Sequence, residues 1–197
     1  MKRRLLLAIT LSGLLPKGFG QSGGTFEQDY YLGINRSFCW VPVVGFYTPG
    51  NWYAEARINY EATNTVSLYI GKTFKKKALV SYSITPLAGL VSGRFNGGSV
   101  GANATVDYKK ISFSSQSQYT FSAENQATNF TYSWSDLTYQ LKKWVGAGLS
   151  LQQTGRQFEK GILVKGVYKN LSMPLYFFNP TASNRYFIVG LSLEWDH

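Results

Sequence analysis

Two oppositely charged side chains, Glu55 and Arg57, lie two residues apart in a segment where apolar and polar residues alternate. In an extended strand, residues two apart project from the same face, so this carboxylate and guanidinium lie side by side. Such a pair either neutralises itself within a narrow interior or lines a constriction that selects solutes by charge and size. Other alternating segments also place charged residues on the inward-facing parity. These are Asp107, Lys165 and Glu194, and together with Glu55 and Arg57 they are the charged groups that we predict for a lumen.

The residue types needed for catalysis are scarce. The chain has one histidine, His197, which is the terminal residue, and one cysteine, Cys39. A histidine-based nucleophile or an activated water therefore has no scaffold, and a metal site lacks a second histidine or a paired cysteine. We expect no enzyme, no metal site and no cofactor.

The amino terminus has the pattern of an export sequence. Three basic residues follow Met1, an apolar stretch runs from Leu5 to Leu15, and small residues lead to Gly20. The apolar stretch is shorter than the roughly 18 residues that a membrane-spanning helix needs. We predict a secretory signal peptide over residues 1–20 and a mature domain over residues 21–197.

Alternation with a period of two extends along most of the mature domain and predicts strands rather than helices. Ten such segments follow Trp52, and many are about ten residues long, the length that a tilted membrane strand needs. Residues 28–49 form either one more hairpin, which gives twelve strands, or a tail or plug, which leaves ten. The expected fold is all-β: an antiparallel up-and-down transmembrane barrel with strands over about 28–195, most simply of twelve strands.

Two places depart from the regular alternation. The apolar face switches sides within residues 129–141. Apolar residues occupy even positions from Phe130 to Trp134 and odd positions from Leu137 onward, so a bulge is expected near Ser135 and Asp136. Ser115 and Ser117 fall on the nominal lipid side. The remaining inward groups are mostly polar and uncharged; they include Asn103, Ser112, Gln116, Gln118, Thr131 and Ser133.

The connections between strands are of two alternating kinds. Short turns contain lysines, at residues 75–77, 109–110, 142–143 and 169–170, whereas the intervening links are longer and mixed. The formal charge of +10 falls to +6 when the four basic residues of the signal peptide are removed. Lysines at short turns suit a ring of contacts with lipid headgroups on the periplasmic side, and the absence of a basic helix or stripe argues against nucleic acid.

The last strand ends almost at the chain terminus, with an apolar residue at every second position from Phe187 to Trp195. Gly190, Leu193 and Trp195 match the final-strand pattern of small bacterial outer-membrane β-barrel proteins, which this chain resembles. The resemblance implies recognition by the barrel assembly machinery, location in the outer membrane, and contact with its lipids and lipopolysaccharide. In this chain Asp196 and His197 follow the aromatic residue that often ends such proteins.

The predicted strand count bears on function. Eight strands give a barrel about full of side chains and sixteen leave an aqueous channel, so ten to twelve lies between. We expect a narrow passive porin-like channel for small solutes. The alternative is a non-conducting structural or accessory subunit of an outer-membrane complex.

Overall fold

A computed structural model describes residues 23–33 and 38–195, so the predicted signal peptide and His197 lie outside the described residues. Nearly every described residue belongs to a strand or a short connection. The strands are β1 (Gly23–Gly33), β2 (Cys39–Tyr47), β3 (Trp52–Ile58), β4 (Thr65–Lys72), β5 (Phe74–Lys76), β6 (Val80–Gly93), β7 (Gly97–Tyr108), β8 (Ile111–Ser122), β9 (Phe130–Lys142), β10 (Val145–Thr154), β11 (Gln157–Tyr168), β12 (Leu171–Phe178) and β13 (Tyr186–Trp195). A 3-10 turn, Gln126–Thr128, precedes β9.

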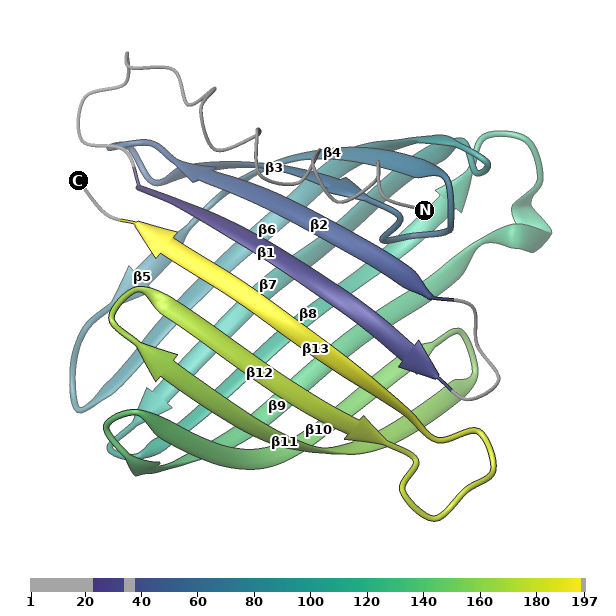
Figure 1. Cartoon of the computed structure of the whole chain (residues 1–197). Helices are drawn as coiled ribbons and strands as arrows, with labels where there is room; N and C mark the ends of the chain where they lie inside the picture. Colours follow the sequence, from purple (N-terminus) through teal and green to yellow (C-terminus); the bar gives the residue numbers. More distant parts are fainter. Residues whose placement is uncertain (1–22, 34–37, 196–197) are drawn as a thin grey trace, which may run out of the picture.

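The strands form one antiparallel sheet that closes on itself (Figure 1). β1 pairs with β13, the last strand, and these two lie side by side in the purple and yellow ribbons of the figure. β4 and β5 both pair with β6 and act as one strand interrupted at Thr73. The thirteen segments therefore make a barrel of twelve strands, and the prediction of twelve is confirmed.

Residues 28–49 contribute the hairpin of β1 and β2, so the alternative of a tail or plug is wrong. β1 begins at Gly23, five residues earlier than expected. Both strands are needed for closure, because β1 joins β13 on one side and β2 joins β3 on the other.

The two faces of the sheet differ in chemistry. Outward apolar side chains such as Leu68 and Leu149 are 63% and 62% exposed, whereas the inward side chains of Ser67 and Thr120 are 0% exposed. An apolar exterior and a polar interior are the reverse of a soluble barrel and suit a sheet surrounded by lipid. Among residues 23–33 and 38–195, no helix is both long and apolar enough to span a bilayer.

The bulge expected near Ser135 and Asp136 is absent. β9 pairs without interruption with β8 from Phe130 to Tyr139, and the irregularity lies instead further along the pairing of β9 with β10, where Leu141 of β9 is the extra residue opposite Val145 and Gly146. The aromatic side chains of Tyr132 and Trp134 therefore face the interior, where both find hydrogen-bond partners.

The same register places Thr131 and Ser133 on the outer face, so their prediction as lumenal groups is wrong. The outer hydroxyls are paired across strands: Ser117 to Ser133 at 2.8 Å and Ser115 to Ser135 at 2.9 Å. Hydrogen bonding between these hydroxyls offsets the cost of polar groups on an apolar face.

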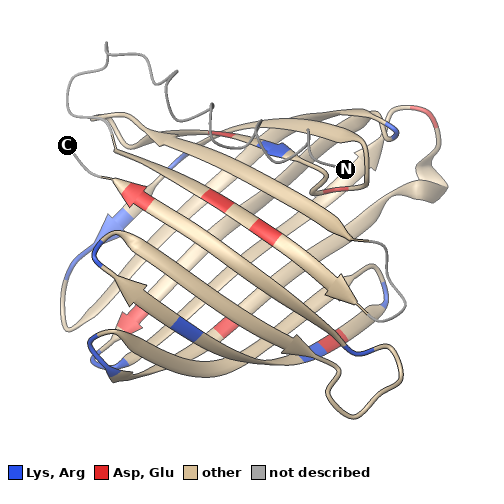
Figure 2. Ribbon diagram, viewed as in Figure 1, with Lys and Arg blue, Asp and Glu red and all other residues tan. Residues whose placement is uncertain are grey.

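The lysine-containing turns gather at one end of the barrel, where β13 ends, and the longer connections lie at the other (Figure 2). Two of these lysines lie over aromatic rings at the same end. The Lys109 and Lys169 ammonium groups are 5.1 and 5.5 Å from the ring centres of Tyr108 and Tyr168. This arrangement combines a positive charge and an amphipathic ring at the level expected for a membrane interface.

Candidate functional site in the barrel lumen

The lumen has a polar wall centred on Arg57, whose side chain is 2% exposed. Arg57 lies on β3 with Glu55, and the two form an ion pair through the guanidinium Nε. Its Nη1 donates a hydrogen bond of 2.6 Å to the amide oxygen of Gln118 on β8. Because β8 is not a neighbour of β3 in the sheet, this bond crosses the interior.

Aromatic rings complete the surroundings of the guanidinium. Its central carbon lies 4.2 Å from the ring centre of Tyr60 and 4.3 Å from that of Tyr69. The Tyr53 hydroxyl donates to the second carboxylate oxygen of Glu55. Arg57 is thus held by charge, by hydrogen bonds and by two π faces, a combination that satisfies a buried cation.

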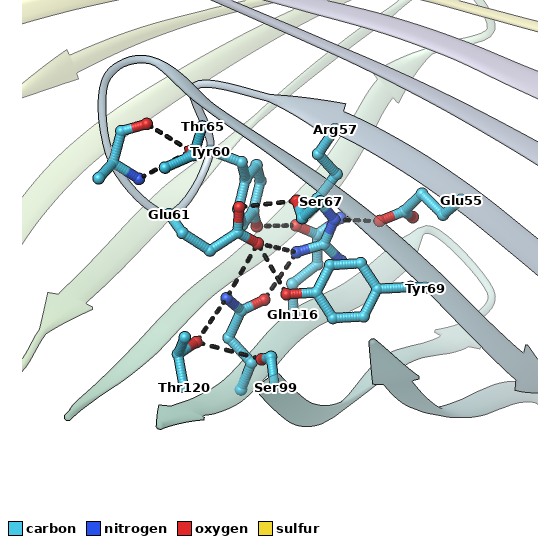
Figure 3. Close-up of polar contacts among 12 residues, drawn as sticks. Glu55, Arg57, Tyr60, Glu61, Thr65, Ser67, Tyr69, Ser99, Gln116 and Thr120 are labelled. Carbon is cyan, nitrogen blue, oxygen red and sulfur yellow. Dashed lines mark hydrogen bonds and ion pairs between the residues drawn. The ribbon is translucent and has the colours of Figure 1, made fainter. Parts of the chain in front are cut away.

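The β3–β4 connection, residues 59–64, folds into the lumen (Figure 3). The Glu61 side chain is 0% exposed, lies 3.8 Å from Arg57 Nη1, and accepts hydrogen bonds of 2.7 Å from Ser67 and Tyr69. Tyr60 donates a 2.6 Å hydrogen bond to Gln116 on β8.

The ring of Tyr60 lies 5.3 Å from that of Tyr132 on β9. The connection therefore reaches from β3 and β4 to strands on the other side of the barrel and narrows the lumen at this level.

A second carboxylate is held on β9. Asp136 accepts hydrogen bonds from Ser150 at 2.6 Å, from the Trp134 indole at 2.9 Å and from Tyr176 at 3.0 Å. All three donors are neutral, so they fix the position of the carboxylate without cancelling its charge.

The opposite part of the lumen is an aromatic wall. Leu163, Tyr176, Phe178, Tyr186 and Ile188 form a buried cluster on β11, β12 and β13. The rings of Phe178 and Tyr186 stack with centres 5.2 Å apart. The Tyr186 hydroxyl lies 2.9 Å from the amide oxygen of Gln152 on β10 and 2.7 Å from the carboxylate of Glu159 on β11, and its one proton is shared between these two acceptors.

The structure brings only some of the predicted lumenal charges together. Glu55 and Arg57 are in contact, as described above. Lys165 is half-buried on β11, and Glu194 is exposed near the end of β13; both lie within electrostatic range of Glu27. Asp107 is exposed near the end of β7 opposite Ser81 and Ser112, away from the Arg57 contacts.

Sequence reasoning missed four lumenal carboxylates and so underestimated the charge of the interior. Glu27 and Asp29 lie on the inward face of β1, opposite Ser192 and the buried Gly190 of β13. They alternate with Phe26 and Gln28, a pattern that indicates a strand with one acidic face. Asp136 was missed because a bulge was expected beside it. Glu61 was missed because it lies in a connection that no strand pattern covers.

The final-strand residues lie on both faces of β13. Gly190 is buried, and a Cβ there would lie 2.6 Å from the Pro174 ring and 2.9 Å from the Asp29 carboxylate, so glycine permits this close approach. Leu193 is 42% exposed on the outer face. The ring of Trp195 packs edge to face against that of Phe46, with the ring centres 6.4 Å apart. Recognition of these residues by an assembly machinery stays a prediction.

No combination of histidine, cysteine and carboxylate side chains suited to a metal ion occurs within the described ranges. The groups that are assembled in the lumen are ion pairs, neutral hydrogen-bond donors and aromatic rings. Such a lining can attract, repel and orient solutes.

No protein-family model matches the chain, and no curated protein matches its sequence. Several solved structures, in contrast, are similar to this chain in fold. The KdgM porin has a TM-score of 0.64 at 12% identity over 87% of this chain and 99% of that one, as does KdgM in complex with disordered oligogalacturonate. OccK5 (OpdH) of Pseudomonas aeruginosa has a TM-score of 0.50 at 9% identity over 91% and 68% of the two chains. The chain has the fold of the bacterial outer-membrane β-barrel porins.

Proposed function

We propose that this protein is a narrow passive channel for small solutes in the bacterial outer membrane. The observation that supports it best is the inserted connection at residues 59–64, whose Glu61 and Tyr60 contact strands across the lumen. A segment folded inside a polar barrel narrows a passage and defines what can pass through it.

The location rests on the fold and on the two faces of the sheet. The apolar exterior suits a bilayer, and the chain begins with the predicted export sequence. With the lysine end in the periplasm, the lysines contact lipid headgroups. The longer connections at the other end contain Arg94, Arg156 and Arg185, which can pair with lipopolysaccharide phosphates. Gly190, Leu193 and Trp195 would direct assembly.

Conductance in a planar bilayer tests the proposal. Folded, purified protein should give discrete current steps in symmetric potassium chloride, because each inserted barrel adds one pore. Heat-unfolded protein at the same concentration is the control for detergent leakage. A silent bilayer at high load of demonstrably folded protein would contradict the channel.

The packed aromatic wall favours one other candidate, a non-conducting accessory barrel. The rings of Tyr176, Phe178 and Tyr186 fill space inside the barrel that a wider pore would leave to water. Pull-down from a mild-detergent extract tests this candidate. A reproducible envelope partner together with a silent bilayer would support it, whereas a conducting monomer would exclude it.

The fold similarity does not transfer a solute. Oligogalacturonate, found with the KdgM porin, is a chain of acidic sugars. The carboxylates Glu27, Asp29 and Asp136 in this lumen would repel such a polyanion. We therefore propose small solutes, without a catalysed reaction, as the substrates.

A further inference from the structure

The middle of the lumen holds more acidic than basic side chains. Among the described residues, the inward charges in the central parts of the strands and in the inserted connection are five carboxylates against two cations, a formal excess of three negative charges. The carboxylates are Glu27, Asp29, Glu55, Glu61 and Asp136, and the cations are Arg57 and Lys165. Most other described lysines and arginines lie at the two rims.

The internal contacts do not pair these carboxylates with cations one to one. Glu55 and Glu61 share the single guanidinium of Arg57. Asp136 is held by neutral donors, as described above.

Glu27 and Asp29 are half-buried and lie within electrostatic range of each other. Within the described part of the chain, no hydrogen bond or ion pair joins either of these two to another side chain. Lys165 and Arg57 are the cations within electrostatic range of Glu27, and Lys165 is also within range of Asp136, so two cations serve all five carboxylates.

A second, independent observation points to the same ligand chemistry. Tyrosine rings lie beside these carboxylates, and the lumen already holds one cation in this way: the Arg57 guanidinium lies 4.2 and 4.3 Å from the ring centres of Tyr60 and Tyr69. The face of an aromatic ring attracts cations and offers nothing comparable to anions. The Arg57 side chain thus shows that the ring faces of this lining accommodate a cation.

From these observations we infer that the channel prefers cations to anions and passes small solutes with an ammonium or guanidinium group more readily than carboxylates of equal size. This inference rests on the proposed channel function, because it needs a conducting lumen. Carboxylates confined in a low-dielectric wall raise the local concentration of counter-ions by a factor of 10 or more at low salt. The preference therefore weakens as salt rises, because the screening length falls from about 10 Å at 0.1 M to about 3 Å at 1 M.

The reversal potential under a potassium chloride gradient tests the inference. We expect a potassium-to-chloride permeability ratio on the order of 10 at low salt, and a ratio lowered to about half or less in the double variant Glu27→Gln with Asp29→Asn, because two of the charges that produce the field are removed. The matched control is Glu124→Gln. It removes one carboxylate from the exposed β8–β9 connection, outside the barrel interior, and should leave the ratio unchanged.

A flux measurement extends the test to organic solutes. Vesicles containing the folded protein should take up L-arginine several-fold faster than L-glutamate, two solutes of similar size and opposite charge. The difference should shrink in the double variant and persist in Glu124→Gln. Discrete current steps with a chloride preference or no preference would overturn the inference and leave the channel standing, whereas a silent bilayer with folded protein would overturn both.

Discussion

The polar wall and the aromatic wall of the lumen are held by different forces. On the polar wall, Arg57 has defined partners at fixed distances, and each carboxylate near it depends on that one cation. On the aromatic wall, Phe178 and Tyr186 are 0% and 1% exposed and are held chiefly by ring packing. Loss of one residue therefore leaves an unpaired buried charge in the first wall and a cavity in the second.

The largest effect is expected from Arg57→Met. Methionine preserves much of the volume but leaves Glu55 and Glu61 without their cation, and breaking a buried ion pair costs about 3–5 kcal/mol. Urea unfolding in lipid vesicles should show a loss of stability in this range. Release of the connection at residues 59–64 should also make the single-channel current noisier.

The triple variant Arg57→Met, Glu55→Gln, Glu61→Gln separates charge from shape. It should recover part of the lost stability, because no unpaired charge then remains in the wall. Arg94→Met, an exposed rim arginine 3.4 Å from Thr63, is the matched control and should change stability little. If the triple variant is no more stable than Arg57→Met, charge pairing does not organise the polar wall.

Phe178→Ala should give the next largest effect. The change removes a fully buried ring that stacks on Tyr186 and packs edge to face against Trp134, with ring centres 5.8 Å apart. Such truncations in packed interiors lower the free energy of unfolding by about 3 kcal/mol. Because water can enter the space, conductance should rise while ion selectivity stays the same. Phe158→Ala, on an exposed ring, is the control and should alter neither quantity. If ion selectivity changed while conductance stayed constant, the aromatic wall would not act by excluding water from part of the lumen.

Asp136→Asn should have a smaller effect on stability and a clear one on selectivity. The asparagine oxygen can still accept from Trp134 and Ser150, but Tyr176 loses its carboxylate acceptor, which costs about 1–2 kcal/mol. The potassium preference should fall because one central negative charge is removed. An unchanged reversal potential would place Asp136 outside the conducting path.

The smallest effect is expected from Tyr60→Phe. The variant loses only the hydrogen bond to Gln116, worth about 1 kcal/mol, and keeps the ring against Arg57 and Tyr132. Stability should drop slightly and conductance should stay near the wild-type value. A large gain in conductance from this single change would show that the hydrogen bond alone holds the connection in the lumen.

The sequence predicted the barrel, its strand number and the lysine end because these follow from alternation and turn length. The prediction was wrong where the sequence allowed either set of alternate residues in a strand to face the lipid. In β9, aromatic residues on one parity suggested a lipid face, but Trp134 and Tyr132 have polar tips that Asp136 and Gln152 satisfy inside the barrel. Glu61 was beyond prediction, because only the closed barrel brings the β3–β4 connection near β8.

A single-channel recording of the folded wild-type protein, under a potassium chloride gradient at low salt, is the most direct test of a cation-preferring channel. We expect discrete current steps whose reversal potential lies on the potassium side. Folded protein that produces no steps, or steps that reverse on the chloride side, would contradict it.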